Sequence, residues 1–163
     1  MGKSVLVPQF PTNQNATAES WGEVLNGIKD QITPRTVFVA HSLGCLATIR
    51  FVVQHSIQID KACLVAGFSD LRLQKSVIKE KADHLNRVAT PFLLTQKEKT
   101  DFNKFCQETI CLYSDNDHLL PIQNLKKFAD DIGAKHMFIK NKGHFSEGAG
   151  VFQIPQLLTI LQH

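Results

Sequence analysis

A serine placed between a buried strand and a helix is the feature that most constrains this chain. Residues 36–40 form a short apolar, β-branched run, which predicts a buried strand. Residues 43–55 then carry apolar side chains at helical spacing. Ser42 lies between the two elements, and the small residues Ala40 and Gly44 flank it at a distance of two positions. We therefore expect a sharp turn that presents the serine hydroxyl at the carboxyl edge of a sheet and at the positive end of a helix.

This geometry is typical of a nucleophile elbow, but the pattern departs from Gly-x-Ser-x-Gly at its first position, where Ala40 stands. Alanine is the next smallest residue, so the departure weakens the match only slightly. Ser42 could instead be a helix cap in an ordinary strand–helix connection. The five residues alone do not decide between a nucleophile and a cap.

The composition is that of a chain that folds around a core. Hydrophobic residues make up 43% and charged residues 20% of the 163 residues, and we expect one domain over residues 1–163. The formal net charge is +3, and the lysines over 75–81 and 97–104 are interleaved with acidic and apolar residues. These stretches indicate a solvated surface, so we expect no nucleic-acid partner.

The four cysteines show no C-x-x-C spacing, and Cys45, Cys63 and Cys111 lie in or beside apolar elements. We interpret them as small hydrophobic residues in a reducing compartment, and neither as zinc ligands nor as a disulfide framework. No apolar run reaches the roughly 18 residues that span a membrane, and we expect no secretory signal peptide. Position 6 is Leu where a myristoylation motif requires Ser or Thr. We expect a cytoplasmic protein with no membrane association.

Strands and helices alternate along the chain. Besides 36–40, strands are predicted over residues 4–7, 61–66, 109–113 and 136–139, and helices over 18–32, 43–55, 76–87, 101–106, 122–132 and 151–161. The irregular stretch 68–107 is consistent with a lid or binding loop and equally with a plain surface excursion. The alternation predicts an α/β fold with a mostly parallel sheet, right-handed crossovers and helices on both faces.

Three residues of complementary chemistry follow three of the predicted strands. Ser42 follows 36–40, Asp117 follows 109–113, and His144 follows 136–139. Active groups gather at the carboxyl ends of parallel strands, and this chain order of Ser, Asp and His is that of the α/β-hydrolases. A serine hydroxyl needs a base, histidine titrates near neutral pH, and a buried carboxylate orients the imidazole.

Each member also has a purely structural interpretation. Asp117 could cap the helix that begins near Pro121, and His144 is one of seven histidines. We interpret His118 as a loop residue and His41 as a structural part of the elbow. The joint pattern carries more weight than its parts, because three separate strand ends hold the three required residue types in the required order.

Five stretches together resemble one protein family. They are residues 7–11 with Trp21, 39–45, 64–68, 114–117 with Pro121, and 143–145. These stretches are spread over nearly the whole chain. Through them the sequence resembles the small α/β-hydrolase-fold serine hydrolases that include retinoblastoma-binding protein nine and its bacterial relatives. The resemblance implies an α/β-hydrolase-like three-layer sandwich.

The same resemblance implies a catalytic triad of Ser42 as nucleophile, His144 as base and Asp117 as acid. Asp117 is chosen over Asp115 because the family's carboxylate precedes its proline by four positions, as Asp117 precedes Pro121. The resemblance also implies that the backbone N–H of Leu43 is an oxyanion donor.

The chain departs from the family at its N-terminus. Family members open with a further strand and a His-Gly loop before the position of residues 5–8. The missing strand would lie between 5–8 and 36–40, and the missing loop would supply the second oxyanion donor. We therefore expect an N-terminally truncated form of the fold, or a wrongly assigned start. The loss of a central strand would threaten stability unless residues 5–8 pair directly with 36–40.

Three functions are compatible with these residues. The first is a serine hydrolase that cleaves a small carboxylic ester, thioester or amide through an acyl-enzyme on Ser42, with a small-molecule acyl substrate and no metal or organic cofactor. The alternative is a catalytically weak or inactive hydrolase-fold protein that acts by binding a protein partner. A third is acyl transfer from the same intermediate. Phe68, Phe92 and Phe102 either line an acyl pocket or belong to the core.

Overall fold

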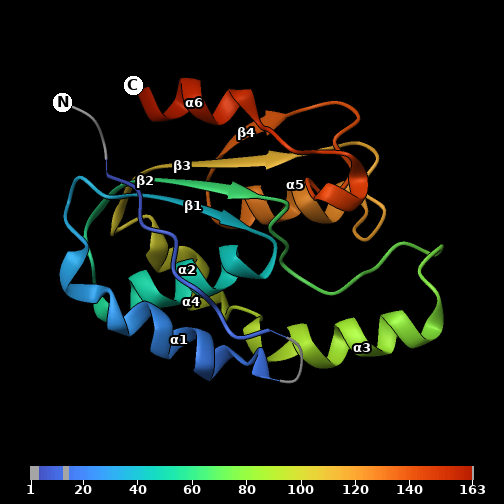
Figure 1. Ribbon diagram of the computed structural model, residues 1–163, viewed down its shortest axis with the longest axis horizontal. Coiled ribbons are helices and arrows are strands. Elements are labelled where there is room, and N and C mark those ends of the chain that lie inside the picture. The colour runs from blue at the N-terminus through green and yellow to red at the C-terminus, as the bar shows by residue number, and fades with distance from the viewer. Residues whose placement is uncertain (1–3, 13–14, 163) are drawn as a thin grey trace.

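The computed structural model describes residues 4–12 and 15–162, which are organised around a four-stranded sheet (Figure 1). The strands are β1 (Val37–His41), β2 (Ile59–Val65), β3 (Cys106–Tyr113) and β4 (Lys135–Phe138). They lie in the order β1-β2-β3-β4, and every neighbouring pair is parallel. Since all four strands point the same way, the loops that follow them meet at one edge of the sheet.

Alternate residues of the two central strands, β2 and β3, enter two separate cores, as the period of two along a strand requires. On β2, Ala62 and Leu64 pack into the larger core, whereas Cys63 and Val65 face the smaller one. The larger core also contains the buried side of α2 (Leu43–His55), and the smaller core is closed by α6 (Pro155–Gln162). Both faces of β2 are thus buried, which explains why its sequence is continuously apolar after Lys61.

The helices form layers on both sides of this sheet. They are α1 (Ala18–Gly27), α2, α3 (Lys79–Ala89), α4 (Gln96–Phe102), α5 (Ile122–Asp131) and α6, with short 3-10 turns at Lys29–Gln31, Thr90–Phe92 and Glu147–Ala149. Figure 1 shows α6 on one side of the sheet and α1, α2 and α4 on the other. The predicted three-layer arrangement with a parallel sheet is confirmed. Within the described residues, no helix combines the length and the apolar character needed to cross a membrane.

Most of the predicted elements are present, with shifted ends. The helix predicted over 18–32 ends at Gly27 and continues as the 3-10 turn Lys29–Gln31. The helix predicted over 101–106 is wrong in position, because α4 begins earlier, at Gln96. Thr95 and Glu98 form a capping box that starts α4 there. Cys106 instead begins β3, where it pairs with Ile59 of β2.

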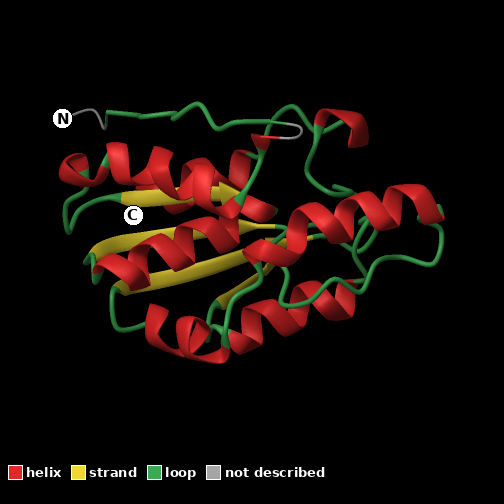
Figure 2. Cartoon of the chain, turned by 90° about the horizontal axis from the view of Figure 1, so that it is seen from below, coloured by secondary structure: helices red, strands yellow, loops and turns green. Residues whose placement is uncertain are grey.

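The strand predicted over 4–7 is also wrong, and the direct pairing of residues 5–8 with 36–40 that would have replaced the missing strand does not form. No strand occurs in residues 4–12, which Figure 2 draws as loop, and β1 is an edge strand of the described sheet. Val5 and Val7 are 84% and 80% exposed. The segment is held by α1 instead, because Trp21 packs on Phe10 and donates a hydrogen bond from Nε1 to the carbonyl oxygen of Pro11 (2.9 Å). A β-branched run favours an extended backbone, but it becomes a strand only when a neighbour supplies hydrogen bonds.

Candidate active site

Ser42 occupies a strained turn between β1 and α2. Its backbone has φ 53° and ψ −121°, a left-handed φ that is uncommon for a residue with a side chain. The N–H of Ser42 donates to the carbonyl oxygen of Val65 on the neighbouring strand (2.8 Å), which anchors the turn to β2. A Cβ added to Gly44 would lie 3.9 Å from the Cβ of Ala40, so these two small residues face each other across the turn. The local structure is that of an elbow.

The fold brings Ser42, His144 and Asp117 into one hydrogen-bonded chain. His144 Nδ1 lies 2.7 Å from Oδ2 of Asp117, and His144 Nε2 lies 3.0 Å from Oγ of Ser42. A carboxylate only accepts hydrogen bonds, so Nδ1 carries the proton and Nε2 is left free to accept from the serine hydroxyl. This is the tautomer that a base acting on Ser42 requires.

Asp117 is buried and fully hydrogen-bonded. It is 3% exposed, and its second oxygen, Oδ1, accepts from the N–H groups of Leu119 (2.8 Å) and Leu120 (3.0 Å). Burial by itself would raise the pKa of this carboxyl, but the hydrogen bonds from His144, Leu119 and Leu120 outweigh it and lower the pKa. Asp117 therefore stays ionised beside His144. It does not cap the following helix, as the structural interpretation supposed, because Leu119 and Leu120 precede that helix and its N-cap Pro121 has no side-chain hydrogen bond.

The loop after β3 holds the loop after β4 through its side chains. Three consecutive residues each accept one backbone N–H of the segment that leads to His144. The pairs are Asp115 Oδ1 with Asn141 (2.9 Å), Ser114 Oγ with Lys142 (2.8 Å) and Asn116 Oδ1 with Gly143 (2.7 Å). Sequence reasoning assigned no role to Ser114 and Asn116, although the polar run Ser-Asp-Asn-Asp that directly follows a strand is the signal that could have found them.

The segment around His144 has an unusual backbone that needs this support. Asn141, Gly143 and Phe145 all have positive φ, at 58°, 51° and 52°. A Cβ at Gly143 would lie 2.7 Å from the Cβ of Ala149, closer than real Cβ atoms pack. Glycine at this position thus satisfies both a left-handed backbone and a close contact.

Two further histidines flank His144. His41 Nε2 lies 2.7 Å from the carbonyl oxygen of His144, and the centroids of the two rings are 4.9 Å apart. The ring of His118 lies 6.2 Å from the ring of His144. His118 is an exposed loop residue, as predicted, and His41 links the elbow to the His144 loop.

The other predicted residues are placed as follows. Leu43 is the first residue of α2, where N–H groups have no acceptor within the helix, so its N–H is available to an oxyanion. Phe68, Phe92 and Phe102 are at most 4% exposed and belong to the larger core, which agrees with the structural interpretation of these rings. Among the residues that the structure describes, no three His, Cys, Asp or Glu side chains are grouped to hold a metal ion.

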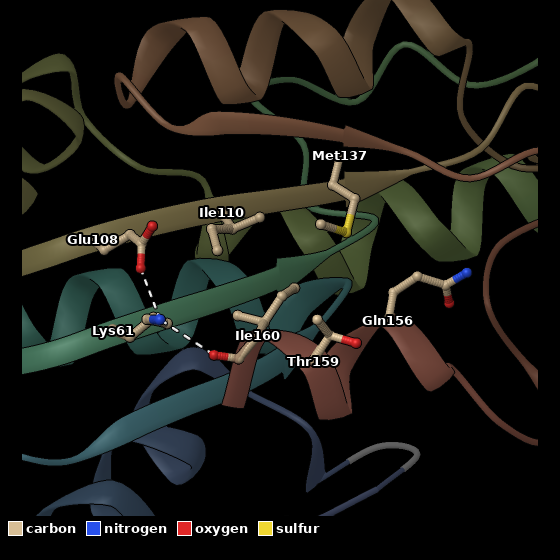
Figure 3. Close-up of a pocket in the computed structure, with 7 residues that line it drawn as sticks. All are labelled: Lys61, Glu108, Ile110, Met137, Gln156, Thr159 and Ile160. Atoms are coloured by element: carbon tan, nitrogen blue, oxygen red, sulfur yellow. Dashed lines mark hydrogen bonds and ion pairs between the residues drawn. The ribbon is translucent and has the colours of Figure 1, made fainter. Parts of the chain in front are cut away.

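A cavity of about 390 Å³ lies away from these residues, between the sheet and α6 (Figure 3). In it, Lys61 Nζ pairs with Glu108 Oε2 (2.8 Å) and donates to the carbonyl oxygen of Ile160 (3.2 Å). Lys61 and Glu108 lie in the N-terminal halves of β2 and β3, whereas Ser42, Asp117 and His144 follow the carboxyl ends of strands. Lys61 caps the carbonyl end of α6 and holds this helix on the sheet.

The fold is shared with solved hydrolases. The crystal structure of YdeN from Bacillus subtilis matches with a TM-score of 0.74 at 23% identity, over 89% of this chain and 73% of YdeN. The meta-cleavage product hydrolase CumD of Pseudomonas fluorescens IP01 matches with a TM-score of 0.62 at 14% identity, over 93% of this chain and 71% of CumD. These matches confirm the predicted α/β-hydrolase-like fold.

Sequence comparison agrees with the structural one. YdeN of Bacillus subtilis (strain 168) is 25% identical to this chain over 158 residues, which span 93% of this chain and 75% of YdeN. A family model described as serine hydrolase matches residues 2–163, almost the full length. The chain therefore belongs to the serine hydrolase family.

Proposed function

We propose that this serine hydrolase cleaves a small carboxylic ester, thioester or amide through an acyl-enzyme on Ser42. The observation that carries the proposal is the continuous hydrogen-bonded chain from Ser42 Oγ through His144 to Asp117, with 3.0 Å and 2.7 Å between the bonded atoms. The elbow backbone of Ser42 supports it, because strain of this kind is kept where a side chain must be presented.

In the acylation step, Ser42 Oγ attacks the acyl carbon while its proton passes to His144 Nε2. Asp117 accepts the hydrogen bond from Nδ1 and stabilises the imidazolium that forms. The N–H of Leu43 donates to the oxyanion of the tetrahedral intermediate. Collapse of this intermediate breaks the bond to the leaving alcohol, thiol or amine, which takes the proton from His144.

Deacylation repeats these steps with water. His144 Nε2 removes a proton from a water molecule that attacks the acyl carbon. The second tetrahedral intermediate collapses, the bond to Ser42 Oγ breaks, and the proton returns from His144 to the serine. The products are a carboxylic acid and the regenerated enzyme, and the balance requires no metal or organic cofactor.

The proposal includes two narrower points. Within the serine hydrolases, the motifs at 39–45, 114–117 and 143–145 support kinship with the branch that includes retinoblastoma-binding protein nine. The four cysteines of the chain are free and buried, which supports a reducing, cytoplasmic location.

A fluorophosphonate probe tests the proposal, because it forms a covalent bond only with an activated serine. We expect the purified protein to be labelled once, and Ser42→Ala to abolish labelling while the melting temperature stays within a few degrees. Ser76→Ala, which changes an exposed serine in the loop before α3, is the matched control and should be labelled at the rate of the parent protein.

Two results would contradict the proposal. If Ser42→Ala is still labelled as fast as the parent, another serine is the nucleophile. If a folded parent protein is not labelled at all, Ser42 is not activated, and the alternative of a hydrolase-fold protein that binds a protein partner would replace the enzyme.

A further inference from the structure

We propose that His41 is a positioning residue that holds the main chain of His144 and must stay uncharged while His144 acts. The inference rests on the proposed function, since His144 needs positioning only if it takes the proton of Ser42. It assigns a role to a residue that the sequence pattern placed only in the elbow.

The first argument is a hydrogen bond between two distant parts of the chain. His41 is the last residue of β1, and its Nε2 lies 2.7 Å from the carbonyl oxygen of His144. A carbonyl oxygen only accepts, so Nε2 of His41 carries a proton and donates. The contact joins the strand that presents Ser42 directly to the residue that accepts the proton of Ser42.

The second argument is that His41 completes the support of the His144 segment. The side chains of Ser114 and Asn116 accept the N–H groups of Lys142 and Gly143, so they hold the backbone just before His144. His41 holds the carbonyl group of His144 itself. A backbone with positive φ on both sides of His144, at Gly143 and Phe145, persists only when the surrounding contacts determine it.

The third argument is electrostatic. The rings of His41 and His144 have centroids 4.9 Å apart, so a charged His41 would oppose the imidazolium that forms on His144. The other ionisable groups near this pair are Asp117, which hydrogen-bonds to His144, and His118, whose ring lies 6.2 Å from that of His144.

The environment keeps His41 uncharged at neutral pH. His41 as a residue is exposed, but the part of its ring that is withdrawn from water lowers the pKa of His41, and the neighbouring His144 lowers it further. The hydrogen bond to the His144 carbonyl and the charge of Asp117 raise the pKa in part, but the balance is a lowered value. The neutral form still donates from Nε2, so the hydrogen bond and the absence of charge are compatible.

Two substitutions separate the donor from the charge. His41→Phe keeps a ring but removes the donor, and we expect the rate of fluorophosphonate labelling and the kcat for a chromogenic ester to fall about 100-fold with little change in KM. His41→Gln keeps an N–H donor without a titrating group, so it should retain most of the activity at pH 8. Because glutamine does not ionise, its pH profile should carry no contribution from position 41.

The matched control is His118→Gln, which changes the other histidine ring beside His144. It should leave the labelling rate at pH 8 unchanged. A melting curve for each variant shows that the fold is kept. Hydrogen exchange of the Lys142 and Gly143 amides adds a readout independent of activity, and we expect it to be faster in His41→Phe than in the parent or in His41→Gln.

The outcomes distinguish this inference from the proposed function. If the parent is labelled at Ser42 but His41→Phe matches it in rate, pH profile and amide exchange, the role of His41 is wrong and the function stands. If His41→Gln is as slow as His41→Phe in labelling and ester hydrolysis, the loss of activity is not caused by the loss of the hydrogen-bond donor. If the folded parent is not labelled at Ser42, the proposed function fails, and the positioning role fails with it even where amide exchange still responds to His41→Phe.

Discussion

Asn116 Oδ1 accepts a hydrogen bond of 2.7 Å from the backbone N–H of Gly143, the residue directly before His144. Ser114 Oγ donates to the same oxygen of Asn116 (3.0 Å) and itself accepts the N–H of Lys142 (2.8 Å). The loop that carries Asp117 thereby fixes the loop that carries His144 at several points. The distance between Asp117 and His144 is thus set by main-chain contacts as well as by their own hydrogen bond.

Asn116→Ala should lower activity without unfolding the protein. The substitution leaves the N–H of Gly143 without its side-chain acceptor, and a base displaced by about 1 Å can cost about 100-fold in rate. Asn116→Asp keeps an acceptor oxygen and should recover most of the loss. Steady-state kinetics with a chromogenic ester, beside a melting curve for each variant, measure this. Equal kcat values for Asn116→Ala and the parent would contradict the positioning of this loop by Asn116.

Asp117→Asn and Asp115→Asn should differ greatly in activity. An amide at position 117 cannot stabilise the His144 imidazolium, and the analogous change in a serine protease lowers kcat about 10⁴-fold. Asp115 accepts from the N–H of Asn141 and from the hydroxyl of Ser114 (3.4 Å), and an asparagine oxygen can also accept both, so we expect less than a ~10-fold effect there. The rates of ester hydrolysis of the two variants decide the point. Similar losses in both would mean that the acid is not Asp117 alone.

Gly67→Ala should destabilise the protein by about 1–3 kcal/mol through overpacking. A Cβ on Gly67 would lie 2.7 Å from Cδ1 of Phe128 and closer still to Cε1, and this ring is 1% exposed in the larger core. Gly22→Ala is the matched control. No atom lies within 4 Å of a Cβ at Gly22 in α1, so alanine should stabilise the helix by about 0.5–1 kcal/mol. Denaturant unfolding gives both values, and a shift of the same sign in the two variants would refute the steric argument.

The stability of the protein should depend on Asp131 above pH 4 and lose this dependence at lower pH. Burial would raise the pKa of Asp131, but Lys127, Ser69 and Lys99 donate to it and lower its pKa to about 2. A lowered folded-state pKa stabilises the fold above the ordinary value of 3.8, and this contribution disappears as the pH falls towards about 2.

The measurement is the free energy of unfolding of the parent and of Asp131→Asn between pH 2 and pH 7. The difference should be on the order of 1 kcal/mol above pH 4, after allowance for screening by solvent, and should shrink as the pH falls. Asp83→Asn, an exposed change on α3, should show no such trend. A difference between parent and Asp131→Asn that is constant across this range would contradict the linkage.

The regular elements could be predicted where the local pattern is strong. The helix over 43–55 has the same ends in the structure, because its apolar spacing and the turn at Ser42 are local signals. The prediction of a helix over 101–106 was wrong because Cys106 belongs to strand β3, where it pairs with Ile59. This pairing partner is 47 positions away in the chain, so no local pattern indicates it. The prediction of a strand over 4–7 was wrong for the opposite reason: its apolar residues favour an extended backbone, but no neighbouring strand pairs with them.

The order of strands and helices, and the order of Ser42, Asp117 and His144 after three of the strands, could be inferred from the amino-acid sequence. Both follow from patterns of a few residues, which act over one element. The folded structure was needed to show which oxygen each donor of the His144 loop meets, that His41 reaches the carbonyl group of His144, and that β1 lies at an edge of the described sheet. These contacts join residues from 27 to 103 positions apart, and such pairs are specified by how whole elements pack and not by any local spacing.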